Sequence, residues 1–468
     1  MDRRDGLVVA GLGAVLITWL LPAVNYGVDA HHDGIMLKPA LDVLAGQSLF
    51  RDTFTHYGAL TTYLQAAAMW FQPTLLAVRV LTAGAHVVTL FFLYAAWRHV
   101  LPRSLAALSC GLFILFVPVY EKDWLNDYWM LMPWSSTYAL MFQSVGLYAL
   151  LRMIQGNDPV RWAALLGAAC GCVFWCRMPV GVTMTGGLVI IWLALGWTRW
   201  EPAGTSRKKI LIGLILGLGV VHGLMLFNLL LTGALREWWY QIFIWPRKWV
   251  QLEVGLTWQQ FVTIYVHPLA AFGLLAVPAA LLGWRRLNPT PTHRPAWIIP
   301  SVCLVVVAIA VWQHDWALRA LSLRGGGWTA LLPLVVLILS AMSLGPVIRR
   351  RAQAQPTEYY LVAAWTVLSL ASLPQYYPLP DPWHILWSAA PAFGLLALLF
   401  WRWSGWSASV TTAVLVVAFV PAAYTKVVSF NEAGRQPWVT LEAPGLLRGM
   451  KVRPQVASLY GQVAQTLS

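Results

Sequence analysis

Apolar segments long enough to cross a lipid bilayer recur along almost the whole chain of 468 residues. A membrane-spanning helix needs about 20 mostly apolar residues, and backbone polar groups in lipid must be satisfied within the segment itself. The sequence therefore predicts an all-α polytopic membrane bundle of about thirteen transmembrane helices. The predicted spans are Leu7–Val24, Leu75–Trp97, Leu105–Tyr120, Ser136–Leu151, Ala163–Cys176, Val182–Trp197, Ile210–Leu231, Phe261–Gly283, Trp297–Trp312, Trp328–Ile348, Tyr360–Leu373, Ile385–Trp401 and Val410–Ala423.

The composition excludes an ordinary soluble domain, because 59% of the residues are hydrophobic and only 11% are charged. The 28 tryptophans fit belts at the two membrane surfaces, where an apolar ring with one N–H group is well accommodated. The first apolar segment is longer than the apolar region of a secretory signal peptide. We interpret it as an uncleaved first span.

The net charge of +14 does not indicate nucleic-acid binding, because of where the charges fall. If the N-terminus is cytoplasmic, short basic loops such as Arg207–Lys209 and Arg349–Arg351 lie on the cytoplasmic side, and the opposite side is nearly neutral. This is the positive-inside pattern of membrane proteins. The sequence predicts a transmembrane domain over residues 1–423, which contains the first outer loop at 25–74, and an extracytoplasmic tail at 424–468.

Polar and ionisable residues are concentrated in this first outer loop. Ionisable groups beside a bilayer are costly unless they are paired or hydrated, so such a cluster is by default a hypothesis of a functional site. Its members are Asp29, His31, His32, Asp33, Arg51, Asp52, His56 and Tyr57.

Two short amphipathic helices are expected in the same loop. Apolar residues recur at helical spacing between Ile35 and Gln47, and Pro39 is expected in the first turn, so the first helix should begin near Ile35. Gly46 is expected to end it. This first helix is too short to span the bilayer and is expected to lie along the membrane surface. The second, Ala59–Trp70, is expected to follow a hinge at Gly58 and to dip back into the membrane before the second span.

Asp33 is the leading catalytic candidate, because a carboxylate at the membrane surface can act as a general base on an incoming hydroxyl. Two alternatives stay open. Asp33 suits the N-terminal cap of a helix that begins near Ile35. Together with Asp29, His31 and His32 it also offers oxygen and imidazole ligands for a divalent cation. The spacing of these residues does not match the pattern of any particular metal site. The sequence therefore predicts no cofactor, and a divalent cation stays an alternative.

Two arginines are candidates for binding a lipid phosphate, which a guanidinium can hold with two parallel hydrogen bonds. Arg51 precedes His56 and Tyr57, which are further candidates for substrate binding, and its alternative role is an ion pair that folds the loop. Arg177 lies at the outer end of a predicted span, and its alternative role is that of an interfacial arginine. Arg79 lies inside a predicted span, where we expect it to pair within the bundle or to reach the interface.

A second polar constellation lies between Gln375 and His384, on the face predicted to be the outer one. Asp381 and His384 stand three residues apart in a segment rich in proline and aromatic residues, with Tyr377 shortly before them. Aromatic faces flanked by hydrogen-bonding groups suit sugar rings. They suit a belt at the lipid headgroups equally well.

The order of these residues resembles a known family. An aspartate in the first outer loop, followed by A-x-x-x-L-x-G-x-x-x-x-R-D and a Y-G-x-L segment, is similar to the GT-C superfamily. These are polytopic glycosyltransferases that use lipid-phosphate sugars, among them the protein O-mannosyltransferases and the lipid A aminoarabinose transferase. The stretch from Tyr377 to His384 also resembles the Y-x-x-x-D-x-x-H motif of bacterial members. The first match comprises Asp33, Ala40, Leu44, Gly46, Arg51, Asp52, Tyr57, Gly58, Ala59 and Leu60.

The resemblance implies a protein of the bacterial cytoplasmic (inner) membrane with an extracytoplasmic active site. It implies inverting transfer of a sugar from a polyprenyl-phosphate donor to a hydroxyl of an envelope glycan, lipid or protein, with Asp33 as the base. Many members carry paired acids at this point, whereas Asp33 is followed by Gly34, so Asp29 is the candidate for the second carboxylate. The expected substrate-binding residues are His32, Arg51, His56, Tyr57, Arg177, Tyr377, Asp381 and His384.

Two other functions compete with this interpretation. A transporter or flippase is expected to carry charges at the bilayer midplane on broken helices, together with an inverted repeat. Here the ionisable groups stand at the outer ends of the predicted spans. A non-catalytic envelope-assembly protein has no need for a clustered Asp, His and Arg loop. The sequence also lacks a glycine-rich phosphate loop for a soluble nucleotide, and it favours the glycosyltransferase.

Overall fold

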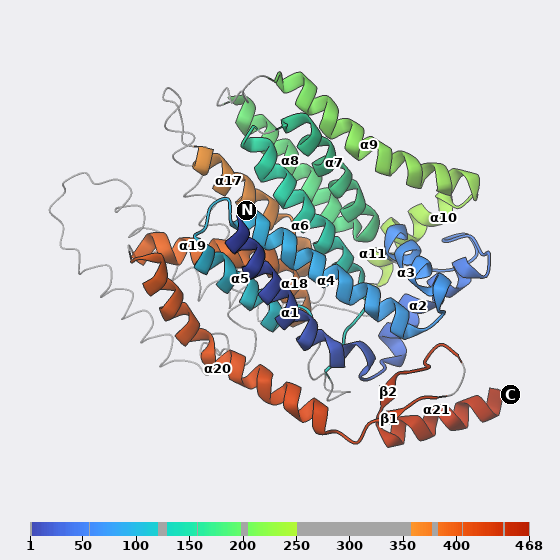
Figure 1. Ribbon diagram of the computed structural model, residues 1–468. Coiled ribbons are helices and arrows are strands. Elements are labelled where there is room, and N and C mark those ends of the chain that lie inside the picture. Colours follow the sequence, from blue (N-terminus) through green and yellow to red (C-terminus); the bar gives the residue numbers. More distant parts are fainter. Residues whose placement is uncertain are drawn as a thin grey trace, which may run out of the picture.

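The computed structural model describes residues 2–55, 57–119, 129–156, 158–197, 205–249, 357–376, 382–404, 406–442 and 445–467. Within these ranges the protein is an integral membrane bundle of helices (Figure 1), and six helices are long and apolar enough to cross a membrane. They are α1 (Arg3–Asn25), α4 (Leu75–Trp97), α6 (Ser135–Ile154), α7 (Pro159–Cys176), α8 (Met178–Trp197) and α9 (Arg207–Leu231).

Other predicted spans form shorter helices or fall outside the described ranges. The segment Leu105–Tyr120 yields only α5 (Arg103–Phe116), whose 14 residues are fewer than the roughly 20 that cross a bilayer alone. Phe261–Gly283, Trp297–Trp312 and Trp328–Ile348 lie outside the described residues. The number of spans and the cytoplasmic N-terminus therefore stay predictions. The later helices are α17 (Thr357–Leu370), η5 (Leu373–Tyr376), α18 (Pro382–Ala389), η6 (Ala390–Ala392), α19 (Phe393–Ser404) and α20 (Ala408–Arg435).

Glycines allow α7 and α9 to approach backbone to backbone. Gly167 on α7 and Gly213 and Gly217 on α9 face the opposite helix. A Cβ atom built on Gly217 would lie 1.9 Å from the carbonyl oxygen of Ala164, and one built on Gly167 would lie 2.1 Å from that of Leu214. Small residues at such interfaces are the main way in which membrane helices pack closely, because lipid supplies no hydrophobic drive between them.

Alanine at position 217 should therefore separate α7 from α9. We expect Gly217→Ala to lower the free energy of unfolding in detergent by about 1–3 kcal/mol, the usual cost of overpacking. Gly219 of the same helix has no neighbour within 4 Å of a built Cβ, so Gly219→Ala is the matched control. Equal thermal midpoints for the two variants would contradict the packing argument.

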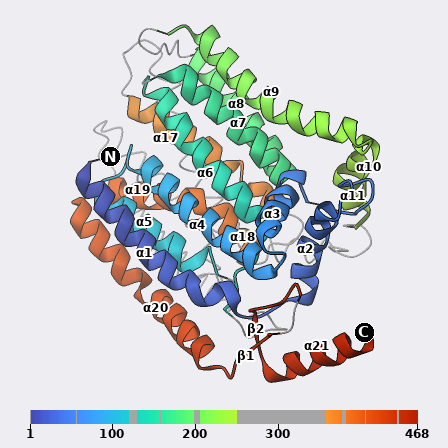
Figure 2. The same cartoon turned by 45° about the vertical axis from the view of Figure 1, so that its right-hand side comes forward.

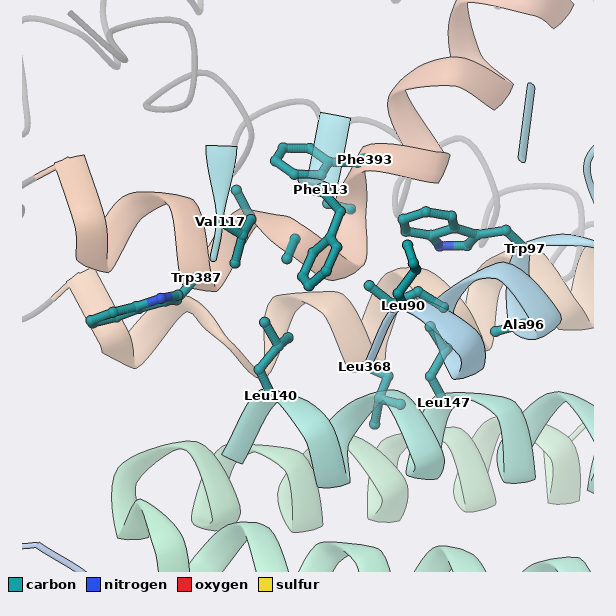
Figure 3. Packing of buried hydrophobic residues seen from close by; sticks show 14 of the residues in the cluster. Leu90, Ala96, Trp97, Phe113, Val117, Leu140, Leu147, Leu368, Trp387 and Phe393 are labelled. Atoms are coloured by element: carbon teal, nitrogen blue, oxygen red, sulfur yellow. The ribbon is translucent and has the colours of Figure 1, made fainter. Parts of the chain in front are cut away.

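The core joins segments that are far apart in the sequence. Trp97 of α4 lies 6.5 Å from Trp365 of α17, measured between ring centroids, and the Trp365 indole donates to the carbonyl of Pro391 at 2.8 Å. Figure 3 shows the same layer, with Phe113 of α5 and Phe393 of α19 between α4 and the later helices. The C-terminal third of the chain thus completes the core of the N-terminal helices.

At one end of the bundle, a buried carboxylate binds two arginines. Asp5 at the start of α1 accepts hydrogen bonds from Arg98 at 2.8 Å, from Arg103 at 2.9 Å and from the Tyr94 hydroxyl at 2.9 Å. The two arginines flank the short link between α4 and α5. Because α1 runs from this end to the first loop, the polar cluster of the first loop lies at the opposite end.

The first loop forms two short helices, α2 (Ala30–Leu44) and α3 (Ala59–Phe71). The predicted start of the first helix near Ile35 is wrong, because Asp29 caps the helix and it begins at Ala30. Pro39 consequently lies in the middle of α2 rather than in its first turn. The predicted stop at Gly46 is confirmed: this residue follows the last turn with φ of +85°. The second predicted helix matches α3.

The C-terminal region returns to this loop. The predicted tail boundary at residue 424 falls inside α20, which continues to Arg435 and packs on α1 through the stacked rings of Phe430 and Trp19, 5.1 Å apart. Beyond it lie the two-residue strands β1 (Val439–Thr440) and β2 (Lys451–Val452) and the helix α21 (Pro454–Leu467). Both views place β1, β2 and α21 beside α2 (Figures 1 and 2).

Candidate active site

The start of α2 is organised by Asp29. One carboxylate oxygen of Asp29 accepts the backbone N–H groups of His31 at 3.0 Å and His32 at 2.8 Å, and the other contacts Nδ1 of His32 at 3.0 Å. Such a cap stabilises a helix by about 1 kcal/mol. Burial acts to raise the pKa of Asp29, but the hydrogen bonds from His32 and His31 outweigh it and lower the pKa. Asp29 is therefore held as a carboxylate.

Asp33 forms a buried ion pair with Arg79 of α4. The Nη2 group of Arg79 donates to Oδ2 of Asp33 at 2.9 Å, and the two side chains are 0% and 3% exposed. The Nη1 group of Arg79 donates to the carbonyls of Tyr26 at 2.8 Å and Gly27 at 3.0 Å. Arg79 is thus the intrabundle partner that its sequence position suggested. It ties the end of α1 to α2.

The two oxygens of Asp33 have different surroundings. Oδ2 also accepts the backbone N–H of Asp29 at 2.9 Å, whereas Oδ1 is buried and has no hydrogen-bond partner among the described residues. Burial raises the pKa of Asp33, against the opposing charge of Arg79 and the N–H of Asp29. One oxygen therefore fixes the carboxyl group in place, and the other lies buried without a hydrogen bond from a described residue.

Trp134 brings the first loop to the second polar constellation. Its ring centroid lies 5.0 Å from that of His32, 5.6 Å from that of His384 and 5.0 Å from that of Trp387. His32 and His384 are 352 positions apart in the sequence and flank one indole. The structure thus brings the N-terminal loop and His384 together through Trp134, which the sequence analysis did not single out.

Arg177 lies next to the hinge of the first loop. The N–H of Gly58 donates to the carbonyl of Cys176 at 3.2 Å, and Arg177 lies 3.4 Å from the Ser135 hydroxyl at the start of α6. A Cβ atom at position 58 would lie 2.0 Å from the carbonyl oxygen of Trp175, so only glycine allows this approach. Burial raises the pKa of Tyr57, and the positive charge of Arg177 acts in the opposite direction. The two side chains therefore lie within electrostatic reach of each other.

Arg51 takes the loop-folding role that the sequence left open. Its guanidinium donates to both oxygens of Asp52, at 2.9 and 2.8 Å, and to the carbonyl of Thr232 at 2.8 Å. Gln241, in the π-helical turn η1 (Tyr240–Ile244) between α10 (Leu235–Trp239) and α11 (Trp245–Trp249), holds the same loop from the other side. It donates to the carbonyl of Phe50 at 2.7 Å and accepts the N–H of Thr55 at 2.9 Å.

Three predicted site residues, His56, Tyr377 and Asp381, lie outside the described residues. Among the residues that are described, no three His, Cys, Asp or Glu side chains are grouped to hold a metal ion. What the structure brings together at one end of the bundle is a carboxylate pair, two histidines on an indole, and an arginine beside a tyrosine. Of the described site candidates, Asp29, His32, Asp33, Tyr57, Arg177 and His384 belong to this group.

The fold is similar to that of solved membrane glycosyltransferase structures. The archaeal oligosaccharyltransferase AglB from Archaeoglobus fulgidus, solved with an inhibitory peptide and a dolichol-phosphate, superposes with a TM-score of 0.50 at 12% identity, over 92% of this chain and 56% of AglB. The chain has a GT-C-like fold. It spans about half the length of the archaeal enzyme.

Two further structures are similar at lower scores. The Archaeoglobus fulgidus oligosaccharyltransferase with Zn and sulfate gives a TM-score of 0.49 at 13% identity, over 91% of this chain and 53% of that one. ArnT from Cupriavidus metallidurans in the apo state gives 0.39 at 15% identity, over 86% of this chain and 78% of ArnT. No protein-family model and no curated protein matches the sequence.

Proposed function

We propose that this protein is a membrane glycosyltransferase. It moves a sugar from a polyprenyl-phosphate donor to a hydroxyl of an envelope glycan, lipid or protein on the extracytoplasmic face. The observation that carries the proposal is the meeting of the Asp29–Asp33 pair, the ring cluster of His32, Trp134 and His384, and Arg177 at one end of a GT-C-like bundle. The dolichol-phosphate bound to AglB is consistent with a lipid-phosphate donor.

In this proposal Asp33 is the general base. Its Oδ1, which accepts no hydrogen bond from a described residue, takes the proton of the acceptor hydroxyl, and the hydroxyl oxygen attacks the anomeric carbon from the face opposite the phosphate. The C–O bond to the phosphate breaks in the same step, so the configuration inverts. Arg79 and the Asp29 N–H hold Oδ2 so that the carboxyl group does not rotate during the transfer.

Arg177 and Tyr57 are assigned to the leaving lipid phosphate. A guanidinium fixed at the end of α7 can stabilise the charge that develops on the phosphate without having to reorganise. His384 is assigned to the sugar, and Trp134 contacts both His384 and His32. His32, positioned by Asp29, links the base to this ring cluster.

The assay that tests the proposal uses the purified full chain in vesicles, with radiolabelled polyprenyl-phosphate sugars and an envelope extract as acceptor. We expect Arg177→Gln to lower kcat/KM for the donor about ten- to 150-fold, which is the equivalent of the roughly 1.5–3 kcal/mol of a hydrogen bond to a charged group. Arg236, an exposed arginine of α10, supplies the matched control Arg236→Gln. Transport of the intact donor across the vesicle wall without transfer would support the flippase alternative instead.

A further inference from the structure

The C-terminal segment is attached to the turn that precedes the Asp29–Asp33 pair. The N–H of Gly27 donates to the carbonyl of Lys451 in β2 at 2.8 Å, and Tyr26 forms an isolated parallel bridge with the same residue. The Tyr26 ring stacks on Trp438 at 4.7 Å with an interplanar angle of 19°. Strand and indole, both from the last 31 residues, therefore fix the backbone of Tyr26 and Gly27.

This turn also holds Arg79 on Asp33. The carbonyls of Tyr26 and Gly27 accept Nη1 of Arg79, while Nη2 of the same guanidinium donates to Asp33. Gly27 has φ of +65°, a left-handed conformation that a side chain would strain. A continuous chain of contacts therefore runs from Trp438 and β2 through the turn to the carboxyl group of Asp33.

Helix α21 adds a side chain at the same place. Tyr460 packs, half-buried, against the apolar cluster that joins Val28, Leu37 and Ala40 with Met450 and Val452. Burial raises the pKa of Tyr460, and the negative charges of Asp33 and Asp29 raise it further, so the phenol lies within the electrostatic reach of both carboxylates.

We propose that Trp438, β2 and Tyr460 of α21 belong to the active site: Trp438 and β2 set the position of Asp33 through the Tyr26–Gly27 turn and Arg79, and Tyr460 is a positioning residue for the carboxylate pair. The expected changes in transfer rate rest on the proposed function, whereas the expected change in hydrogen exchange rests on the geometry alone. Among the described residues, the charged and titratable groups near Asp33 are Arg79, Asp29 with its partner His32, and Tyr460. The ammonium of Lys451 lies over the Tyr26 ring, 5.4 Å from its centroid.

The first test is Tyr460→Phe in the full chain, which removes the hydroxyl and keeps the ring. A neutral hydroxyl dipole near a carboxylate favours the ionised form, so its loss should raise the pKa of Asp33. We expect the acidic limb of the transfer rate to move up by about half a pH unit. Tyr424→Phe, at an exposed tyrosine of α20, is the control. An acidic limb identical to that of the wild type would overturn the role of Tyr460.

The second test separates this inference from the proposed function. Trp438→Leu removes the stack on Tyr26, and we expect faster hydrogen exchange at the amides of His31, His32 and Asp33 together with a five- to twentyfold lower kcat at unchanged donor KM. Trp438→Phe should restore both. Exchange is measured whether or not the protein transfers sugar, so absent wild-type transfer would reject only the proposed function. Unchanged hydrogen exchange in Trp438→Leu would show that Trp438 does not hold the Tyr26–Gly27 turn in place.

Discussion

Replacing Asp33 by asparagine is expected to abolish sugar transfer while the protein still folds. Asparagine keeps the size of the side chain and can still accept a hydrogen bond from Arg79, but it cannot take up a proton from an acceptor hydroxyl. Loss of a general base typically costs a factor of about 10²–10⁴ in kcat. The measurement is turnover of a radiolabelled polyprenyl-phosphate sugar by purified protein, with the thermal midpoint recorded on the same sample.

The matched control lies on the same helix. Asp42 of α2 is also buried and accepts hydrogen bonds from Thr53 and Lys38, so Asp42→Asn removes a carboxylate without touching the proposed base. Transfer by this variant should stay close to that of the wild type. If Asp33→Asn is folded and as active as Asp42→Asn, Asp33 is not the base, and Asp29 becomes the residue to test.

The pH dependence of transfer follows from the same carboxyl group. Burial raises the pKa of Asp33 above its ordinary value, and a base works only when it is ionised. The rate should therefore rise with pH through a pKa higher than the ~3.9 of a free aspartate. An acidic limb below that value would mean that the rate follows another group, such as Asp29, whose pKa the hydrogen bonds of His32 lower.

The membrane helices could be predicted from sequence because length and apolarity alone determine them. Leu75–Trp97 is both the predicted segment and the observed α4. The first residue of α2 could not be predicted, because both Asp29 and Asp33 suit a helix cap and Pro39 is tolerated in a first turn. The structure resolves this choice through two backbone N–H groups on Asp29. Local sequence does not show which of two equivalent caps is used.

Some residues of the candidate site could be predicted from the sequence. Asp33, His32 and Arg177 stand out as ionisable groups beside apolar segments, which is a local signal. Their partners are not local: Arg79 lies 46 positions from Asp33, and Trp134 and Tyr460 are ordinary aromatic residues in a chain rich in them. Only the packing of α2 against α4, α6 and the C-terminal segment assigns them to the site.

The second large effect concerns Arg79. Replacing it by methionine leaves the Asp33 carboxylate buried without its counter-charge, and breaking such a pair by removing one partner costs about 3–5 kcal/mol. We expect Arg79→Met to lose this much of its unfolding free energy at pH 8, measured by titration of mixed micelles with SDS, and to lose sugar transfer. The carbonyls of Tyr26 and Gly27 also lose their donor, which adds to the loss.

The sign of the pH effect distinguishes a buried charge from lost packing. Without Arg79 the folded-state pKa of Asp33 rises further above its unfolded value, so the group destabilises the protein at high pH and ceases to do so as it becomes protonated. The deficit of Arg79→Met should therefore shrink between pH 8 and pH 5. The double variant Asp33→Asn, Arg79→Met has no charge to bury and should be more stable than Arg79→Met at pH 8. A deficit that is equal at both pH values, and equal in the double variant, would show that Arg79 acts by packing and by the Tyr26–Gly27 turn rather than by holding the carboxylate.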